Sequence, residues 1–293
     1  MPKRCYLTDN ISDGSFKMSN KSSLQVVVAT MHQKDFSKYE KMNLSTDAVF
    51  ANQADETSYS EKTFGNSTAK MITTATRGVG INRNIGLQYA TGDILLIADD
   101  DMVYSDDYEK TVIKAFEENP QADALIFNIE TIGADKGRRL NNKSIQLHLH
   151  NGLNYGAARL AVRRSCLVRE RIFFSTCFGG GTIYSAGEDT LFICDMLKKK
   201  LKIFTYPATI ASVDQTTSTW FTGYNKKLIY DRGAFFGASF GKAAPLLCVY
   251  NLFRHKYIYK EANLTFAQAF KIMCEGTQGY KKLKTSTDDS SEN

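Results

Sequence analysis

The sequence predicts an α/β fold with a doubly wound, mostly parallel central sheet, helices on both faces and a helical C-terminal part. Two observations carry this prediction. Short, apolar, β-branched runs such as 24–30 and 94–98 are typical of strands that are buried on both faces. Segments with helical apolar spacing alternate with these runs in the N-terminal half, and this alternation is the pattern of a parallel sheet.

The predicted elements follow one another regularly in the first half and less regularly afterwards. A helix is expected at 80–90, where Gly92 closes the apolar repeat, and another at 105–119, which ends before Pro120. Further strands are predicted at 47–52, 70–74, 122–129, 159–163, 201–206 and 208–213. Further helices are predicted at 165–171 and 188–200, and the chain after 215 is expected to be helical and aromatic.

The composition favours a globular protein without a nucleic-acid partner. The chain has 293 residues, 43% of them hydrophobic, which is sufficient for one large α/β domain or two small ones. The net charge of +6 is modest and no recognition motif is present. Basic clusters at 198–200 and around Arg254, Lys256 and Lys260 favour an anionic substrate, an anionic membrane surface or simply a solvated helix face.

Cysteine usage and hydropathy predict a cytoplasmic protein. The six cysteines form no C-x-x-C pair, so a zinc site has no support and a reducing compartment is the simplest expectation. Residues 1–23 lack the apolar core of a signal peptide. No run reaches the roughly 18–20 apolar residues that a membrane span needs. The apolar segment 243–253 is shorter and indicates a buried or interfacial helix.

Three consecutive carboxylates follow the buried run 94–98. Asp99, Asp100 and Asp101 stand where the predicted strand ends, and open α/β sheets bind ligands at the carboxyl ends of their strands. Adjacent carboxylates repel one another unless a cation or hydrogen-bond donors balance them. A hard divalent ion, Mn²⁺ or Mg²⁺, prefers oxygen ligands and leaves positions for phosphate oxygens. The segment therefore predicts a metal–diphosphate site, with an acidic helix entry as the alternative.

A glycine-rich segment at 77–86 precedes this site. It is not a dinucleotide fingerprint, because Arg83 stands where the third glycine would be required. Its glycines suit a loop that opens a helix near phosphate or sugar. Arg77 and Arg83 are expected either to pair with a diphosphate or to be surface arginines at a helix entry.

Two further carboxylates open a later predicted helix. Glu188 and Asp189 follow Gly187 and the glycine-rich turn 178–181. Carboxylates at a helix start commonly stabilise the helix dipole. After a glycine-rich turn, one of the two is also a candidate general base for a hydroxyl acceptor, while the other orients it.

In order and spacing these elements resemble the family 2 glycosyltransferases. The resemblance covers residues 24–240 and is closest to bacterial members that build capsule, exopolysaccharide or lipopolysaccharide. It is carried by Thr30-Met31, Asp55, Gly78, Arg83-Asn84-x-Gly86-Leu87, Thr91-Gly92-Asp93, Asp99-Asp100-Asp101 and Gly187-Glu188-Asp189.

The resemblance implies the GT-A fold and a metal-dependent, inverting hexosyl transfer. The implied donor is a nucleotide-sugar, most often a UDP-sugar, and the expected acceptor is a saccharide or a lipid-linked saccharide. The expected parts of the chain are a flexible arm at 1–23, a nucleotide-sugar-binding half at 24–130, an acceptor-binding half at 131–240, a helical extension at 241–283 and a disordered tail at 284–293.

The resemblance also implies roles for single residues. Asp189 is the implied base, with Glu188 beside it, and Asp101 and Asp99 are the implied metal ligands. Donor contacts are expected from Thr30, Asp55, Arg77, Arg83, Asp99 and Asp100. Acceptor contacts are expected from Gly180, Gly181 and Trp220.

Three positions depart from the family pattern. The first strand ends in Ala29-Thr30-Met31 rather than in a Pro-Thr-Tyr-like sequence. Ala98 stands where the first Asp of a D-x-D-D motif would fall, so the metal ligand is either Asp100 or Asp101. Asn52-Gln53-Ala54-Asp55 replaces the usual Asn-Asp-Gly-Ser, which weakens the assignment of Asp55 to the nucleotide base.

Several alternatives stay open at the level of sequence. Trp220 is suited to stacking on an acceptor sugar and equally to core packing. The aromatic residues of 228–259 are expected either to pack or to contact a membrane that carries a lipid-linked acceptor. A sugar nucleotidyltransferase would need a Gly-rich, basic loop after the first strand, and 30–35 lacks one. A non-catalytic nucleotide-sugar-binding protein is the remaining alternative.

Overall fold

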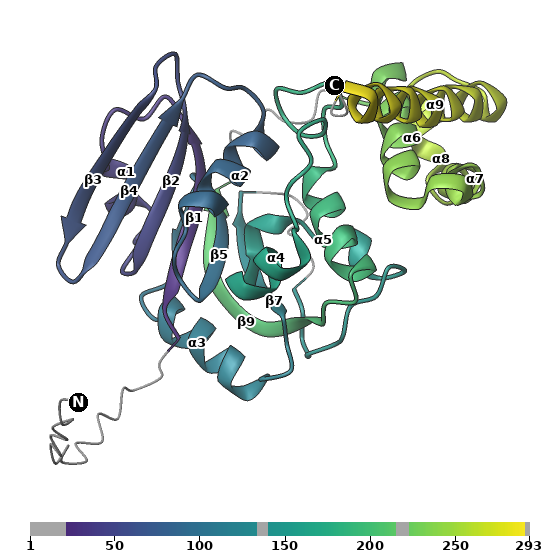
Figure 1. Cartoon of the computed structure of the whole chain (residues 1–293). Coiled ribbons are helices and arrows are strands. Elements are labelled where there is room, and N and C mark those ends of the chain that lie inside the picture. The colour runs from purple at the N-terminus through teal and green to yellow at the C-terminus, as the bar shows by residue number, and fades with distance from the viewer. Residues whose placement is uncertain (1–21, 134–139, 215–222, 291–293) are drawn as a thin grey trace, which may run out of the picture.

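The computed structural model describes residues 22–133, 140–214 and 223–290. Within these ranges the chain forms a nine-stranded sheet in the order β3-β4-β2-β1-β5-β8-β7-β9-β6. Helices flank the sheet, and the C-terminal helices form a separate group at one end of the molecule (Figure 1). The predicted arm at 1–23 lies almost wholly outside the described residues.

The N-terminal half is the parallel part of the sheet. β1 (Leu24–Met31), β2 (Asp47–Gln53), β4 (Ser67–Thr74) and β5 (Ile94–Asp99) pair in parallel around β1. The side chains of β1, β2 and β5 are almost all buried, as the continuous apolar runs predict, whereas β4 is buried at about half of its positions. α1 (Ser37–Lys41) connects β1 to β2, and α2 (Val79–Tyr89) connects β4 to β5.

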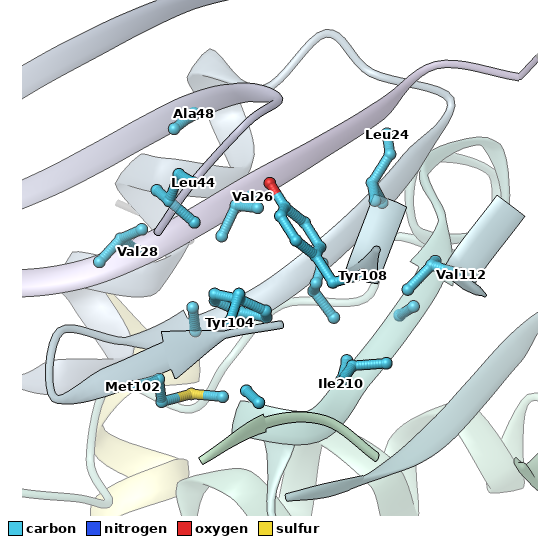
Figure 2. Close-up of a cluster of buried hydrophobic side chains, with 14 of the residues drawn as sticks. Leu24, Val26, Val28, Leu44, Ala48, Met102, Tyr104, Tyr108, Val112 and Ile210 are labelled. Carbon is cyan, nitrogen blue, oxygen red and sulfur yellow. The ribbon is translucent and has the colours of Figure 1, made fainter. Parts of the chain in front are cut away.

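The two faces of the sheet carry separate cores. Alternate residues of β1 divide between them, so that Val26 and Val28 face one core and Val27 faces the other. The first core includes Tyr108 and Val112 of α3 (Tyr108–Glu118), which lie over β1 in Figure 2. α2 covers the opposite face and packs against β1 and β2. The predicted α/β architecture with helices on both faces is confirmed.

Two strands were not predicted from the sequence. β3 (Ser58–Phe64) pairs antiparallel with β4 at the sheet edge, and its side chains are exposed except at Phe64. Because both of its faces are polar, it has no apolar alternation that would mark it as a strand. β6 (Met102–Tyr104) is only three residues long and pairs with β9 at the opposite edge.

The second half of the sheet is mixed. β8 (Leu160–Arg163) is antiparallel to both β5 and β7 (Ala124–Ile132), whereas β7 and β9 (Ile203–Asp214) are parallel. β9 is one strand, although two were predicted around Pro207. The register between β7 and β9 shifts on either side of Asn128, and this irregularity accommodates Pro207 within β9.

Short helices connect these strands. They are the 3₁₀ turns η1 (Gly152–Asn154) and η2 (Ala157–Arg159), α4 (Arg164–Glu170) and α5 (Glu188–Lys198). α5 begins at the two carboxylates that the sequence placed at a helix start. The helix that positions the predicted base is therefore confirmed.

The C-terminal helices pack on one another and are joined to the sheet domain by a small cluster. The helices are α6 (Lys226–Phe240), η3 (Gly241–Ala243), α7 (Ala244–Arg254), α8 (Lys256–Glu261) and α9 (Phe266–Ser290). α6 and α9 approach closely, since a Cβ atom at Gly233 would lie 2.0 Å from the Met273 carbonyl oxygen. Phe178 and Leu191 of the sheet domain share a buried cluster with Ala234 of α6.

The boundaries of this helical part differ from those expected. α6 shares its core with α7 and α9, so the helical group begins before the predicted boundary at 240/241. α9 also continues through 284–290, where the sequence indicated a disordered tail. Among the helices described, none is long and apolar enough to cross a membrane.

Candidate functional site

The acidic triplet lies where the sequence predicted, at the carboxyl end of β5. Asp99 is the last residue of that strand and is in register with Ala29 of β1. The Thr30 hydroxyl donates a 2.5 Å hydrogen bond to Asp100 Oδ2. Lys38 Nζ donates to the Asp100 carbonyl oxygen at 2.8 Å and lies 3.5 Å from Asp100 Oδ2. Thr30 and Lys38 therefore fix the peptide that follows Asp99, whereas Asp101 is exposed.

Arg83 connects the two predicted groups of carboxylates. Its side chain, on α2, is only 3% exposed. Nη2 lies 2.7 Å from Asp99 Oδ1, and Nη1 donates to Glu188 Oε1 at 3.1 Å and to Asp189 Oδ1. The guanidinium also lies over the Phe174 ring, 5.2 Å from its centroid. We call Arg83, Asp99, Glu188 and Asp189 the carboxylate cluster.

Arg83 thus binds carboxylates of this chain and is not the surface arginine that was one of its two predicted roles; the other, a contact with a diphosphate, stays a prediction. Its burial disfavours the charged guanidinium, but Asp189, Asp99 and Glu188 outweigh that effect and raise its pKa. The ion is therefore permanently charged, and it joins Asp99 of the acidic triplet to Asp189 at the start of α5. This is a positioning role.

The two carboxyl groups at the start of α5 are electrostatically unusual. Burial raises the pKa of Glu188, and the adjacent Asp189 raises it further, against the opposing effect of Arg83. Burial also raises the pKa of Asp189, which Arg83 lowers and Asp99 raises, while the Ala157 N–H stabilises the ionised form. A carboxylate whose pKa is shifted upward toward neutral pH is a stronger base. The site therefore contains a candidate general base that is oriented by a guanidinium and a backbone N–H.

The glycine-rich turn at 178–181 holds α2 against α5. At Gly179, where φ is +102°, a Cβ atom would lie 2.5 Å from Val79 Cγ1 and 2.7 Å from Glu188 Cδ. The Gly180 carbonyl oxygen accepts a hydrogen bond from the Val79 N–H at 3.1 Å. A Cβ atom at Gly181 would lie 3.3 Å from the Gly78 nitrogen. Gly180 and Gly181, which were predicted as acceptor contacts, therefore pack against the start of α2.

Asp55 and Arg77 meet one another away from these contacts. Arg77 forms an ion pair with Asp55, whose side chain is 88% exposed, and donates to the Ala54 carbonyl oxygen at 2.8 Å. Gln53 Nε2 donates to the Gly78 carbonyl oxygen at 2.8 Å, which ties the end of β2 to the loop before α2. The pair is thus positioned at the carboxyl end of β2. Trp220 lies outside the described residues.

Sequence reasoning missed several residues that build the site. Asn82 Nδ2 donates to the Thr30 and Ala51 carbonyl oxygens at 3.1 and 2.7 Å, which fixes α2 on β1 and β2. Phe174 and Lys38 contact the site from segments that carry no motif. The sequence could have indicated Asn82, because it is an amide next to Arg83 in the glycine-rich segment. The contacts of Phe174 and Lys38 depend on the fold alone.

Comparisons with known proteins give one family match and several solved structures of similar fold. Residues 53–176 match the family described as Glycosyl transferase family 2. Residues 1–349 of Staphylococcus aureus TarS have a similar structure, with a TM-score of 0.56 and 14% identity, covering 81% of this chain and 73% of that one.

Ligand complexes of the same TarS fragment are also similar. The complex with UDP-GlcNAc has a TM-score of 0.56 and 16% identity, covering 80% of this chain and 73% of that one. The complex with UDP has a TM-score of 0.54 and 14% identity, covering 80% and 72%. No curated protein sequence gives a significant match. At these identities the structures show the fold alone. The chain has the GT-A fold, and its predicted resemblance to the family 2 glycosyltransferases is confirmed over residues 53–176.

Proposed function

We propose that this chain is a glycosyltransferase that moves a sugar from a UDP-sugar to a hydroxyl group of a saccharide acceptor, with inversion at the anomeric carbon. One observation carries the proposal: Arg83 joins Asp99 at the end of β5 to Asp189 at the start of α5. The cluster brings a carboxylate of raised pKa next to the edge of the sheet where ligands bind. The fold is shared with TarS, which was solved with UDP-GlcNAc and with UDP.

In the proposed reaction Asp189 is the general base. It removes the proton of the acceptor hydroxyl while that oxygen attacks the anomeric carbon from the side opposite the diphosphate. A carbon–oxygen bond forms to the acceptor, the bond from the anomeric carbon to the phosphate oxygen breaks, and the proton remains on Asp189. Arg83 and the Ala157 N–H hold the carboxylate in place, and Glu188 orients it. Release of UDP from UDP-sugars, followed in the presence of saccharide acceptors, tests this proposal.

The donor is proposed to lie along the carboxyl ends of β1, β2 and β5. Asp55 and Arg77 stand at the end of β2, where they are available to the nucleotide base. Thr30, Asp99 and Asp100 lie at the ends of β1 and β5, beside the expected ribose and diphosphate. Synthesis of a bacterial surface polysaccharide is the proposed setting.

A divalent metal is proposed to bind with the donor. In the described part of the chain no three His, Cys, Asp or Glu side chains converge as a ready ligand set. Mg²⁺ in nucleotide sites, however, is usually held by one or two carboxylates together with phosphate oxygens, and Mn²⁺ accepts the same ligands. The exposed Asp101 and the half-buried Asp99 fit that arrangement. When bound, Mn²⁺ or Mg²⁺ would stabilise the negative charge on the leaving diphosphate.

Asp101→Ala is expected to weaken UDP binding in the presence of Mn²⁺ by about tenfold or more, because one metal ligand is lost. UDP affinity without the metal should stay unchanged. Calorimetric titration with and without Mn²⁺ measures both, and Asp107→Ala, at an exposed carboxylate directly before α3, is the control. A variant that keeps the metal dependence of the wild type would contradict the role of Asp101.

The C-terminal helices carry an exposed apolar surface that we propose contacts a membrane. Leu246, Tyr250 and Phe253 are 75%, 62% and 59% exposed and, at spacings of four and three residues, share one face of α7. Tyr257 of α8 is 47% exposed. These four residues are the α7–α8 patch.

The charges around the α7–α8 patch favour an anionic lipid surface as its partner. Lys242, Arg254, Lys256 and Lys260 are all exposed on η3, α7 and α8. Apolar and aromatic side chains flanked by lysine and arginine are the pattern of a helix that lies in a bilayer interface, and each basic residue adds about 1 kcal/mol near anionic lipid. Such contact would bring the site to a lipid-linked acceptor.

A double substitution, Leu246→Ser with Phe253→Ser, is expected to reduce binding to vesicles that contain anionic lipid by at least about tenfold, since two large apolar side chains no longer enter the interface. Vesicle cosedimentation measures the effect. Val168→Ser, at a valine that is 64% exposed on α4, is the control. The membrane assignment is overturned if the double variant, the control variant and the wild type bind the vesicles equally. It is also overturned if the wild type binds no lipid and the double substitution instead abolishes its self-association.

A further inference from the structure

A buried carboxylate of the C-terminal helices binds the segment that leads into α5. Residues 182–187 belong to no helix or strand and end directly before Glu188 and Asp189. Asp231 of α6 is only 3% exposed. Its Oδ2 accepts hydrogen bonds from the Ser185 N–H at 3.0 Å and from the Ser185 hydroxyl at 2.7 Å. Asp231 therefore fixes the backbone shortly before the proposed base.

Lys227 balances the charge of this carboxylate and extends the contact. It lies one turn before Asp231 on α6, and its Nζ donates to Asp231 Oδ1 at 2.5 Å and to Oδ2 at 2.6 Å. The same ammonium group donates to the Ile183 carbonyl oxygen at 2.8 Å. A buried charge is stable when it is paired and hydrogen-bonded. Together these side chains hold the backbone at Ile183 and Ser185, and we call Ser185, Lys227 and Asp231 the α6 contact.

Aromatic side chains of the helical group confine the same segment. The Tyr184 ring, which is 2% exposed, stacks on the Phe178 ring with 4.6 Å between their centroids. Tyr280 of α9 lies 5.7 Å from the Phe178 ring. A Cβ atom at Gly187 would lie 3.1 Å from Phe235 Cδ2 of α6. The segment is therefore packed against α6 and α9 up to the residue before α5.

The chain that α6 holds in this way also contacts the carboxylate cluster. A Cβ atom at Gly179 would lie 2.7 Å from Glu188 Cδ, so the glycine-rich turn leaves no space there. The Asp189 carboxylate is held by Arg83 and by the Ala157 N–H. Its backbone follows the segment that is tied to α6. The direction in which this carboxylate points therefore depends on both sets of contacts.

We propose that Asp231 is a positioning residue for sugar transfer, which acts on Asp189 through Ser185 and the start of α5. This inference rests on the proposed function and deepens it. The donor is proposed to lie along β1, β2 and β5, and no hydrogen bond of Asp231 within the described ranges reaches these strands. Loss of the α6 contact accordingly slows transfer without weakening donor binding.

Asp231→Asn tests the inference, because an amide that accepts the Ser185 hydrogen bonds turns its NH2 group toward the Lys227 ammonium. Release of UDP from UDP-glucose, UDP-galactose and UDP-GlcNAc, with methyl glycosides or water as acceptor, gives kcat and KM. The variant should lower kcat by about 10²-fold, the effect that a displacement of about 1 Å has on a reacting group. UDP affinity, measured by calorimetry, should stay that of the wild type. Ser185→Ala, a milder change, removes only the hydroxyl bond and should lower kcat less.

A double variant and a control separate positioning from stability. Asp189→Asn already lacks the base, so the addition of Asp231→Asn should not slow UDP release further, whereas independent effects would multiply. Thr277→Val is the control. It removes a buried hydrogen bond of 2.9 Å from α9 to the Gly233 carbonyl oxygen of α6, away from the α6 contact, and should keep the wild-type kcat.

Hydrogen exchange at residues 183–189 measures the α6 contact without turnover. Exchange there should be faster in Asp231→Asn than in Thr277→Val, and equal exchange overturns the positioning role. The role is also overturned if the two variants have the same kcat, if Asp231→Asn loses UDP affinity together with turnover, or if its effect multiplies with that of Asp189→Asn. A wild type that neither binds UDP nor releases it from any donor overturns the proposed function instead.

Discussion

Asp189→Asn is expected to lower sugar transfer by at least about 10²-fold and to leave UDP affinity close to that of the wild type. The amide has the size of the carboxyl group but does not accept the proton of the acceptor hydroxyl. Turnover of a UDP-sugar and calorimetric titration with UDP measure the two effects. Asp195→Asn, an exposed residue that pairs with Lys198 on the same helix, is the matched control and should be active.

The pH dependence of the wild type gives a second readout of the same role. The pKa of Asp189 is raised by burial, so its proton stays bound at a higher pH than in an ordinary aspartic acid. Transfer should therefore be lost as the pH falls through that raised pKa, and UDP binding should be less affected. The assignment of Asp189 as the base would be contradicted if Asp189→Asn lost UDP affinity and turnover together. It would also be contradicted if this variant turned over at the wild-type rate.

Arg83→Gln is expected to have the largest effect on stability, a loss of about 3–5 kcal/mol in the free energy of unfolding at neutral pH. The substitution leaves Asp99, Glu188 and Asp189 facing one another without their buried cation. Urea unfolding measures the loss. Arg77→Gln removes an exposed ion pair with Asp55 and should cost only about 1 kcal/mol or less.

The loss in Arg83→Gln should depend on pH. Glu188 and Asp189 already have raised pKa values, and removal of Arg83, which lowers both, raises them further. A carboxyl group whose pKa is higher in the folded than in the unfolded state gives stability that is lost as the pH rises through the folded value. The variant should therefore be less impaired near about pH 5 than near about pH 7.5, and Asp189→Asn in the same chain should recover part of the loss. A deficit that is independent of pH would contradict the coupling.

The parts of the fold that the sequence predicted are those with a local signal. The buried strands at 24–30 and 94–98 are continuous apolar runs, and the helix at 188–198 directly follows Gly187, whose φ is +115°. β3 has polar residues on both faces, so nothing in its sequence distinguishes it from a loop. Pro207 suggested a break, but the irregular pairing of β9 with β7 absorbs it.

The candidate site was predictable in its members but not in its connections. Asp99 and Asp189 were identified from their positions at a strand end and a helix start. That Arg83 would bind both, rather than a phosphate, depends on how α2 lies between β5 and α5, which no local pattern encodes.

Calorimetric titration of the wild type with UDP and with GDP, each with and without Mn²⁺, tests the central claim most directly. A UDP-sugar transferase that uses the carboxylate cluster should bind UDP in the presence of the metal, prefer it to GDP, and retain this binding in Asp189→Asn. Absence of nucleotide binding under every condition would contradict the donor site and with it the proposed transfer reaction.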